Sequence, residues 1–395
     1  MKKIVLSFVF TLFFIVTSAI TKAQSPDTCS ISISLLTCTP GKELYSTFGH
    51  SALRVVDRSN NTDLIFNYGT FDFNDPDFYW KFTKGNLLYF VSIENFTDFV
   101  AEYQYEGRGV TEQILNLSCK EKQKLVAALF ENAKEENKYY KYDFTFDNCT
   151  TRLRDMVAKH STLTTKNIRP YRGVTFRKLL HEYLNNSHHY WSKFGIDILL
   201  GTPVDRKMTN EETMFLPDYL LKGFDSSTNR SNKLVVQKTT LFNPTIQIKK
   251  KVIFTPLITF GLLFLIIAVL SFVRSKKMIP FFRFFDFLLF FLYGLLGCFL
   301  LFMWLGTEHK ACAYNFNLLW AFPGHLIVAF FIGQKKKWLR YYYIGTAIVV
   351  SLLAIFGEGP QEMNDAFFPL IVLLLLRCFI RYKEIPASPI TKEVI

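Results

Sequence analysis

Five apolar segments in the second half of the chain restrict its fold more than any other feature. Short polar loops separate them, and they cover residues 252–273, 284–305, 316–333, 341–356 and 367–380. A membrane-spanning helix needs about 20 apolar residues, and about 17 still suffice. The last two segments are marginal by length, but tyrosines at 341–343 and Arg377 are suited to anchor them at the membrane surface. The sequence therefore predicts an all-α transmembrane domain of five helices over residues 252–382.

The charges of the connecting loops predict how these segments are oriented. The first and third loops are basic and contain Arg274, Lys276, Lys277, Arg283, three lysines at 335–337 and Arg340. The fourth loop, 357–365, is acidic and contains Glu358, Glu362 and Asp365. Because basic loops stay in the cytoplasm, the second loop (306–315), the acidic loop and the N-terminal half are expected on the outer side. The C-terminus is then cytoplasmic.

The first residues have the pattern of a secretory signal peptide. Lys2 and Lys3 precede an apolar stretch at 4–16, and the run 21–23 offers a cleavage site before Gln24. An uncleaved anchor helix is the alternative, but the apolar stretch is short for a full span. The sequence thus predicts a signal peptide over residues 1–23 and an exported, periplasmic domain over residues 24–243.

The basic composition does not indicate a nucleic-acid partner in this chain. Its 395 residues include 46 lysines and arginines against 33 acidic residues, which gives a formal net charge of +13. Such a balance can attract nucleic acid. Much of the excess, however, lies beside the apolar segments, where it acts as an orientation signal. The lipid bilayer is therefore the predicted partner, and nucleic acid is excluded.

Seven cysteines bear on the redox chemistry of the exported domain. Cys29, Cys38, Cys119 and Cys149 fall in that domain, where disulfides can form. A nucleophilic thiol must stay reduced, so Cys149 is expected to be unpaired. Cys29 with Cys119 is one possible disulfide among several, and Cys38 is interpreted as structural. Because no Cys-x-x-Cys or Cys/His spacing indicates zinc, neither a metal ion nor a cofactor is predicted.

The exported domain is predicted to be α+β, with its strands mostly before Cys149. Alternating apolar residues predict strands at 31–37, 53–57, 64–68 and 87–91. The second and third of these form a hairpin across Asn60 and Asn61. Helical spacing predicts helices at 119–138 with Ser118 as the cap, from Cys149 onward, at 176–184 and from 214 onward.

Cys149 and His50 are the candidate catalytic residues. Cys149 follows Asn148 at the predicted start of a helix, where the helix dipole and free backbone N–H groups stabilise a thiolate. His50 precedes a predicted strand and can take the thiol proton, which is the minimum for thiol-based acyl transfer. Asn67, on the next strand, is the candidate for orienting His50. The alternative interpretation is a core cysteine, a turn histidine and a strand-end asparagine.

Four further residues are predicted to contact the substrate. Asn148 is either part of the site or a helix cap, and Arg54 is either a lipid-headgroup contact or an exposed strand residue. Glu308 and His309 lie in the second loop, at the outer membrane surface, where polar residues beside spans are costly unless they have a role. Trp320 is interpreted as an anchor at the membrane interface.

The order of the two candidate catalytic residues resembles that in circularly permuted proteins of the NlpC/P60 and lecithin–retinol acyltransferase type. In papain-like enzymes the cysteine precedes the strands that carry the histidine. Here His50 comes first, and Asn148-Cys149 follows the strands. The resemblance implies a circularly permuted NlpC/P60, papain-like fold for residues 24–243. Several proteins of this type act on the acyl groups of lipids.

A closer resemblance, to the Lnb-type bacterial lipoprotein N-acyltransferases, covers nearly the whole mature chain. It is carried by runs at 33–41, 43–46, 49–54, 147–152, 200–205, 214–217, 307–309 and 318–320, and by Asp155, Asn315, Asn317 and Pro323. The resemblance implies that Cys149 takes an acyl chain as a thioester, from a membrane phospholipid or from the lipoprotein's own diacylglycerol. The chain then passes to the N-terminal cysteine amine of a diacylglyceryl-lipoprotein at the bacterial inner membrane.

Two other functions compete with this interpretation. A membrane-anchored cell-wall amidase or endopeptidase of the NlpC/P60 type would use the same cysteine and histidine on a peptide amide. Five membrane spans disfavour it, because one anchor would suffice. A non-enzymatic envelope protein with a decayed thiol site is the third alternative.

Overall fold

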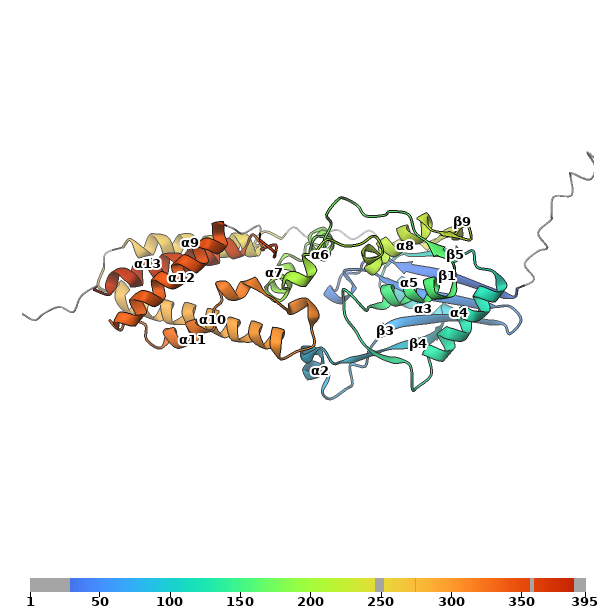
Figure 1. Cartoon of the computed structure of the whole chain (residues 1–395), viewed down its shortest axis with the longest axis horizontal. Helices are drawn as coiled ribbons and strands as arrows, with labels where there is room; N and C mark the ends of the chain where they lie inside the picture. Colours follow the sequence, from blue (N-terminus) through green and yellow to red (C-terminus); the bar gives the residue numbers. More distant parts are fainter. Residues whose placement is uncertain (1–28, 246–251, 274, 356–358, 387–395) are drawn as a thin grey trace, which may run out of the picture.

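The computed structural model describes residues 29–245, 252–273, 275–355 and 359–386. The predicted signal peptide, residues 1–23, lies outside the described residues, as does Glu358 of the predicted acidic loop. A sheet domain and a helical region follow one another along the long axis of the molecule (Figure 1). The predicted α+β class is therefore confirmed, whereas the permuted NlpC/P60 arrangement stays a prediction.

The sheet domain is built on seven antiparallel strands in the order β10-β5-β1-β2-β3-β4-β6. These strands are β1 (Ile31–Cys38), β2 (His50–Asp57), β3 (Thr62–Thr70), β4 (Leu88–Asn95), β5 (Val110–Leu115), β6 (Tyr139–Lys141) and β10 (Val235–Phe242). Each strand predicted from the alternation of apolar residues is present, with its ends moved by a few residues. The predicted hairpin joins β2 to β3, and Asn61 turns the chain with a φ of 50°, which asparagine tolerates.

Helices cover both faces of this sheet. One face packs against α4 (Cys119–Asn132), α5 (Cys149–His160) and α8 (Pro217–Ser226), and the other packs against α3 (Phe96–Tyr105). The central strand β1 is accordingly buried on both sides: Ile33 and Leu35 belong to the first core, and Leu36 and Cys38 to the second. A second sheet of three short strands, β7 (Leu163–Thr164), β8 (Thr228–Asn229) and β9 (Asn232–Lys233), lies beside them.

Helix α4 begins where the sequence predicted, with Ser118 as its cap. Ser118 accepts a hydrogen bond from the Glu121 backbone N–H, and the Glu121 carboxylate accepts one from the Ser118 N–H. This reciprocal capping satisfies two backbone donors that have no partner within the helix. Cys119, in the first turn, is disulfide-bonded to Cys29, which is the pairing that the sequence left as one of several alternatives.

Within the part of the chain that the structure describes, the helical region contains four long helices. They are α9 (Pro256–Ser271), α10 (Met278–Leu305), α12 (Lys337–Ile355) and α13 (Phe367–Glu384). Among the described residues, α10 is the helix that is both long and apolar enough to cross a membrane, and α9 is apolar but has 16 residues. At 1.5 Å per residue, the 28 residues of α10 extend about 42 Å, which exceeds the thickness of a bilayer's hydrocarbon core.

The third predicted span, 316–333, is not a continuous helix, which differs from the prediction. It consists of a 3-10 turn at Phe316–Leu319 and a six-residue helix, α11 (Gly324–Ala329). Irregular backbone at membrane depth is tolerated where protein covers it and supplies hydrogen-bond partners. Trp320, predicted as an interface anchor, is instead 1% exposed, and its indole N–H donates to Asn317. The His325 ring in turn donates to the Trp320 carbonyl at 3.2 Å.

Two glycines of α10 make room for this irregular segment. A Cβ at Gly297 would lie 2.0 Å from the carbonyl oxygen of Ala321, and one at Gly294 would lie 2.1 Å from the Leu326 nitrogen. Such close approach of two backbones through small residues is typical of packing within membranes. The segment therefore runs directly along α10 instead of packing through large side chains.

A buried ion cluster joins three of the helices. Asp286 of α10 accepts hydrogen bonds from Arg377 at 2.6 and 2.9 Å and from Arg381. Arg377 also donates to the Ser271 hydroxyl at the end of α9. Arg377 was predicted to reach the membrane surface, but its side chain is 1% exposed, so that prediction is wrong. The cluster instead neutralises one acidic side chain with two basic ones inside the helical region.

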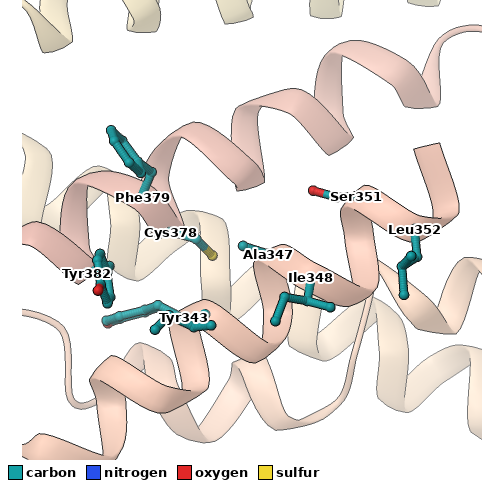
Figure 2. A pocket seen from close by; sticks show the side chains of 9 residues that line it. Tyr343, Ala347, Ile348, Ser351, Leu352, Cys378, Phe379 and Tyr382 are labelled. Carbon is teal, nitrogen blue, oxygen red and sulfur yellow. The ribbon is translucent and has the colours of Figure 1, made fainter. Parts of the chain in front are cut away.

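A pocket of about 470 Å³ lies between α12 and α13 (Figure 2). Its lining includes Tyr343, Ser351, Cys378 and Tyr382. Tyr343 follows the start of α12 and Tyr382 precedes the end of α13, so one end of the pocket lies at the basic loops. Those loops are at the end of the helical region away from the sheet domain, and the pocket is therefore separate from the candidate site described below.

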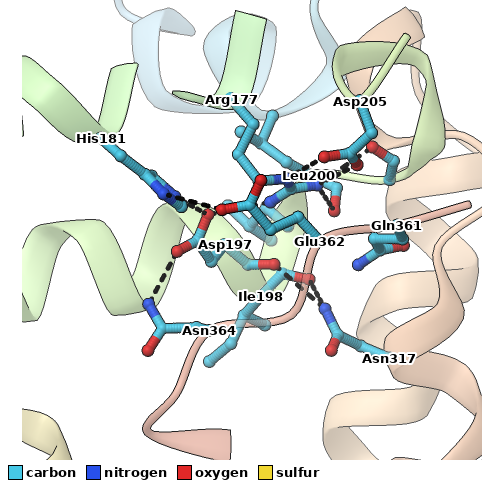
Figure 3. Close-up of polar contacts among 12 residues, drawn as sticks. Arg177, His181, Asp197, Ile198, Leu200, Asp205, Asn317, Gln361, Glu362 and Asn364 are labelled. Carbon is cyan, nitrogen blue, oxygen red and sulfur yellow. Dashed lines mark hydrogen bonds and ion pairs between the residues drawn. The ribbon is translucent and has the colours of Figure 1, made fainter. Parts of the chain in front are cut away.

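The sheet domain contacts the helical region through α6 (Phe176–Asn186) and α7 (Tyr190–Leu199). Figure 3 shows a polar group at this contact, which we call the junction cluster: Arg177, His181, Asp197, Asn317 and Asn364. The Asp197 carboxylate accepts hydrogen bonds from Arg177 and His181 at 2.8 Å each and from Asn364 at 2.7 Å. Asn317 donates to the backbone carbonyl of Asp197 at 3.0 Å. Three elements of the chain are thus held together by one buried carboxylate.

The junction also brings together two runs that carry the family resemblance. Gly201, in the run 200–205, donates its N–H to the Ala311 carbonyl, and a Cβ there would lie 1.8 Å from the Ala313 oxygen. Asn315 donates to the carbonyls of Ile198 and Leu199. Residues of loops 306–315 and 359–366, both expected on the outer side, therefore contact the sheet domain, as an exported sheet domain requires.

Candidate functional site

Cys149 is the first residue of α5, and Asn148 caps that helix. The Asn148 side-chain oxygen accepts hydrogen bonds from the N–H groups of Thr150 and Thr151 at 2.9 Å each. Its amide nitrogen donates to the carbonyls of Phe144 and Phe215. Every polar atom of the Asn148 side chain is thus engaged in fixing the start of the helix. The cap leaves the thiol at the positive end of the helix dipole, which favours a thiolate.

His50 is held by a chain of polar groups that runs across two neighbouring strands. Its Nε2 lies 2.7 Å from Oδ1 of Asn67, and the Asn67 amide nitrogen donates to Glu94 at 2.8 Å. An ionised carboxylate only accepts hydrogen bonds, so Glu94 turns the NH2 group of Asn67 toward itself and the carbonyl toward His50. Nε2 of His50 must then carry a proton and donate it. The other ring nitrogen is left for the thiol.

The structure places the His50 imidazole close enough to the Cys149 thiol for each group to shift the pKa of the other. Burial by itself raises the pKa of the Cys149 thiol, but the positive charge of His50, the hydrogen bonds from His50 and Thr150 and the Ser51 backbone N–H outweigh it and hold the pKa below its ordinary value. Burial lowers the pKa of His50, yet the Cys149 charge and the contacts with Cys149 and Asn67 raise it above its ordinary value. The two shifts favour a thiolate–imidazolium pair.

Gly69 and Tyr103 complete the immediate surroundings of the pair. Gly69, near the end of β3, has a φ of +95°, and a Cβ there would lie 3.4 Å from the Cys149 Cβ. On the other side, the His50 ring stacks parallel to Tyr103 of α3, with the ring centroids 6.4 Å apart. The Arg108 guanidinium lies over the Tyr103 ring, 4.5 Å from its centroid. These contacts restrict the imidazole to the plane in which it meets both Cys149 and Asn67.

Cys149 should be alkylated by iodoacetamide at pH values well below the ordinary thiol pKa of about 8.5. A lowered thiol pKa keeps the thiolate populated as the pH falls, and the rate drops only when that thiolate is protonated. Asn67→Ala removes the hydrogen-bond acceptor that stabilises the imidazolium and, through it, the thiolate. The pH profile of Cys149 alkylation in this variant should therefore move to higher pH. Quantifying the Cys149 peptide by mass spectrometry across pH gives both profiles, with Asn60→Ala, an exposed turn substitution, as the control. A native profile with an ordinary inflection would contradict the ion pair.

The predicted contact residue Arg54 is fully engaged within the sheet domain. Its guanidinium pairs with Asp63 at 2.6 Å and with Glu112 at 3.1 Å, and it lies 3.4 Å over the Phe96 ring. Asn148 is also predicted to contact substrate, but both polar atoms of its side chain are already hydrogen-bonded within the protein. Both residues therefore have structural partners, and their contact with a substrate stays a prediction.

Glu308 and His309 lie at the contact between the two parts of the molecule. The Glu308 N–H donates to the Lys84 carbonyl at 2.9 Å, and its carboxylate pairs with Lys141. The His309 ring donates to the Phe82 carbonyl at 3.0 Å. These contacts hold the second loop against helix α2 (Phe78–Lys84) and strand β6. The structure gives both residues a docking role, and substrate binding by them stays a prediction.

Sequence reasoning missed Glu94 and Tyr103. Glu94 is on β4, and its effect on His50 passes through Asn67; its pKa is raised by burial although the hydrogen bond from Asn67 lowers it. An isolated glutamate in a strand gives no local signal for such a role. No group of three or more histidine, cysteine, aspartate or glutamate side chains among the described residues could hold a metal ion.

The fold and site define a membrane protein whose exported sheet domain places a thiol, an imidazole and an amide in one hydrogen-bonded series. Comparison with family models gives two matches: the Lnb N-terminal periplasmic domain over residues 18–182 and the Lnb transmembrane domain over residues 247–385. The chain belongs to the Lnb-type lipoprotein N-acyltransferases. Comparisons with curated proteins and with solved structures each gave no significant match.

The family assignment fixes the cellular setting in outline. The protein acts in lipoprotein biosynthesis and lies in the inner membrane with its N-terminal domain in the periplasm. The periplasmic match ends at residue 182, within α6, and the transmembrane match begins at residue 247, between β10 and α9. Sheet domain and helical region thus correspond to the periplasmic and transmembrane domains of the family.

Proposed function

We propose that the protein transfers an acyl chain through a thioester on Cys149 to the N-terminal cysteine amine of a diacylglyceryl-lipoprotein. The observation that carries the proposal is the placement of the Cys149 thiol, at the start of α5, beside the His50 imidazole, whose Nε2 lies 2.7 Å from Oδ1 of Asn67. The same three residue types, in the same roles, serve acyl transfer in papain-like enzymes. A membrane phospholipid is the acyl donor, with the lipoprotein's own diacylglycerol as the alternative donor.

In the first half-reaction, the Cys149 thiolate attacks the ester carbonyl carbon of the lipid. The C–S bond forms, the carbonyl electrons move to oxygen, and the resulting oxyanion lies beside the start of α5, where the Cys149 N–H is a donor. When the C–O bond breaks, His50 passes its proton from the ring nitrogen that faces the thiol to the leaving alkoxide. A lysolipid departs, and the acyl chain stays on Cys149 as a thioester.

In the second half-reaction, the lipoprotein amine attacks the thioester carbonyl. His50, now neutral, takes the proton that the amine must lose, and the Cys149 thiolate is the leaving group. An amide forms, and the thiolate–imidazolium pair is restored. Asn67 and Glu94 hold the imidazole in one orientation through both steps, so the same nitrogen donates and accepts the proton.

The thioester should be trapped when the protein is incubated in phospholipid vesicles without any lipoprotein. With no amine to accept the chain, the Cys149 peptide is expected to gain the mass of one acyl group, and hydroxylamine should remove it. Vesicles whose phospholipids carry labelled acyl chains identify the donor, because the adduct then carries the label. Adding a diacylated lipopeptide should discharge the adduct and give an N-acylated product.

The same experiment separates the proposal from its competitors. An adduct that forms only with the lipopeptide present assigns the donor to the lipoprotein's diacylglycerol. Cells that lack the protein should lose the N-linked chain from their lipoproteins while their cell-wall fragments stay unchanged. Altered cell-wall fragments with intact lipoproteins would instead establish the amidase alternative and overturn the acyl-transfer proposal.

A further inference from the structure

Helix α2 is fixed at the outer end of the membrane helix α10. The Trp80 ring of α2 stacks on the Phe302 ring, with centroids 6.5 Å apart, and Phe302 lies in the last turn of α10. The contacts of α2 with the loop at 308–309 hold the helix in the same place. Figure 1 shows α2 between the sheet and that end of the helical region. Because α10 crosses the bilayer, α2 lies at the level of the outer leaflet.

The side chains that α2 exposes are of the kind found at membrane surfaces. Tyr79 is 82% exposed, Trp80 57% and Phe82 52%, and Phe73, just before the helix, is 70% exposed. Lys84 lies 5.0 Å over the Trp80 ring. Tryptophan and tyrosine beside lysine are typical of segments that lie at the level of lipid headgroups, since their rings are apolar and carry a polar N–H or hydroxyl group.

A continuous series of half-buried rings leads from α2 to the thiol. Phe78 of α2 contacts Phe71 with centroids 5.8 Å apart, Phe71 contacts Tyr89 at 5.2 Å, and Tyr89 stacks on Tyr142 at 4.3 Å. The last ring, Tyr142, lies beside the same glycine as Cys149: a Cβ at Gly69 would be 3.7 Å from Tyr142 and 3.4 Å from Cys149. Every ring of this series is only partly buried.

We propose that α2 and this ring series, Phe71, Phe78, Tyr89 and Tyr142, form the route along which the acyl chain of an outer-leaflet phospholipid reaches Cys149. The proposal rests on the proposed function, because it names the surface that the donor chain follows. The occupant is a phospholipid chain because the helix that carries Phe78, the first ring of the series, is also the helix whose Trp80 stacks on Phe302 at the end of the apolar helix α10. Apolar rings replace the contacts that the chain loses when it leaves the membrane.

Two alkylating reagents test the route on the whole protein in phospholipid vesicles. N-hexadecyl iodoacetamide has its reactive carbon at the end of a membrane-soluble chain, and iodoacetamide reaches the thiol from water. The double variant Trp80→Ser, Phe82→Ser should slow alkylation of Cys149 by the hexadecyl reagent by about tenfold, the rate equivalent of losing an aromatic contact or two. Iodoacetamide should react with Cys149 at the native rate, which shows that the thiol site is intact.

A matched control and a second variant keep this test decisive. Tyr105→Ser alters a ring that is 94% exposed at the end of α3, outside the series, and should leave both rates unchanged. Phe78→Ser removes the ring where α2 joins the series and should slow the hexadecyl reagent alone. Equal rates for native protein and α2 variants would overturn the route while leaving the thioester proposal intact. The opposite result is also informative. If the α2 variants slow the hexadecyl reagent but the native protein never forms an acyl adduct on Cys149, the route stands and the thioester proposal is overturned.

Discussion

Replacing Cys149 with alanine should abolish N-acylation of lipoproteins. The sulfur forms the only covalent bond to the acyl chain in the proposed cycle, and removal of a catalytic nucleophile costs roughly three orders of magnitude in rate or more. The measurement is the mass of the N-terminal lipopeptides released from lipoproteins of cells that carry the variant. Loss of the amide-linked chain from every lipoprotein, with normal amounts of the variant in the membrane, is the expected result.

Cys38→Ala is a demanding control for this substitution. Cys38 pairs with His50 across β1 and β2, so it is a second sulfur close to the site, and burial raises the pKa of its thiol well above the ordinary range. A thiol in that state is a poor nucleophile. We expect Cys38→Ala to keep acylation and the double variant to match Cys149→Ala. N-acylation that persists in Cys149→Ala would contradict the mechanism. If Cys38→Ala loses N-acylation and Cys149→Ala keeps it, the nucleophile is the Cys38 sulfur instead.

Asp286→Ala should be among the most destabilising single substitutions in the helical region. It leaves Arg377 and Arg381 buried without their shared carboxylate, and breaking a buried ion pair typically costs about 3–5 kcal/mol. Titration of mixed micelles with dodecyl sulfate, followed by circular dichroism, gives the change in the free energy of unfolding.

Glu384→Ala provides the comparison for that loss. Glu384 also pairs with Arg381, but it is 52% exposed, and exposed pairs contribute about 0–1 kcal/mol. Replacing Arg377 and Arg381 with leucine in the Asp286→Ala background should recover stability, since no unpaired charge then remains buried and Glu384 is exposed. A loss below about 1 kcal/mol for Asp286→Ala would mean that the cluster is hydrated instead of dry.

The thiol, imidazole and amide of the site could be predicted from the sequence because each has a local signature. Asn148 marks a helix start, so Cys149 is placed at the helix N-terminus by the cap alone. His50 and Asn67 lie on the two strands of one hairpin, and a hairpin's register follows from its turn. The contact between His50 and Asn67 could therefore be predicted without knowing how the other strands are arranged.

The remaining parts of the site depend on which elements become neighbours. Glu94 acts on Asn67 because β4 pairs with β3, and Tyr103 reaches His50 because α3 covers that face of the sheet. Neither pairing has a signal within the segment itself. The aromatic residues at 71–82 were visible in the sequence, but their importance appears only when α10 ends beside Trp80.

The third membrane segment shows where counting apolar residues is insufficient. Residues 316–333 are long and apolar enough for a helix, yet Pro323 and Gly324 interrupt it, and Asn317 supplies hydrogen bonds that a regular helix would not need. Arg377 was misplaced for a related reason: its partner Asp286 is 91 residues away in the chain. For Arg377, a polar partner remote in sequence decided the outcome.

The junction cluster has a consequence for how substrates are chosen. Asp197, Arg177 and Asn364 are bonded across the contact between the sheet domain and the helices, with Asp197 almost fully buried, so the reactive sulfur stays at one height above the bilayer. A lipoprotein is tethered to the same bilayer by its own lipid, which holds its first residue near the headgroups. We therefore expect the enzyme to select acceptors by their depth in the membrane and to be indifferent to the folded protein that follows.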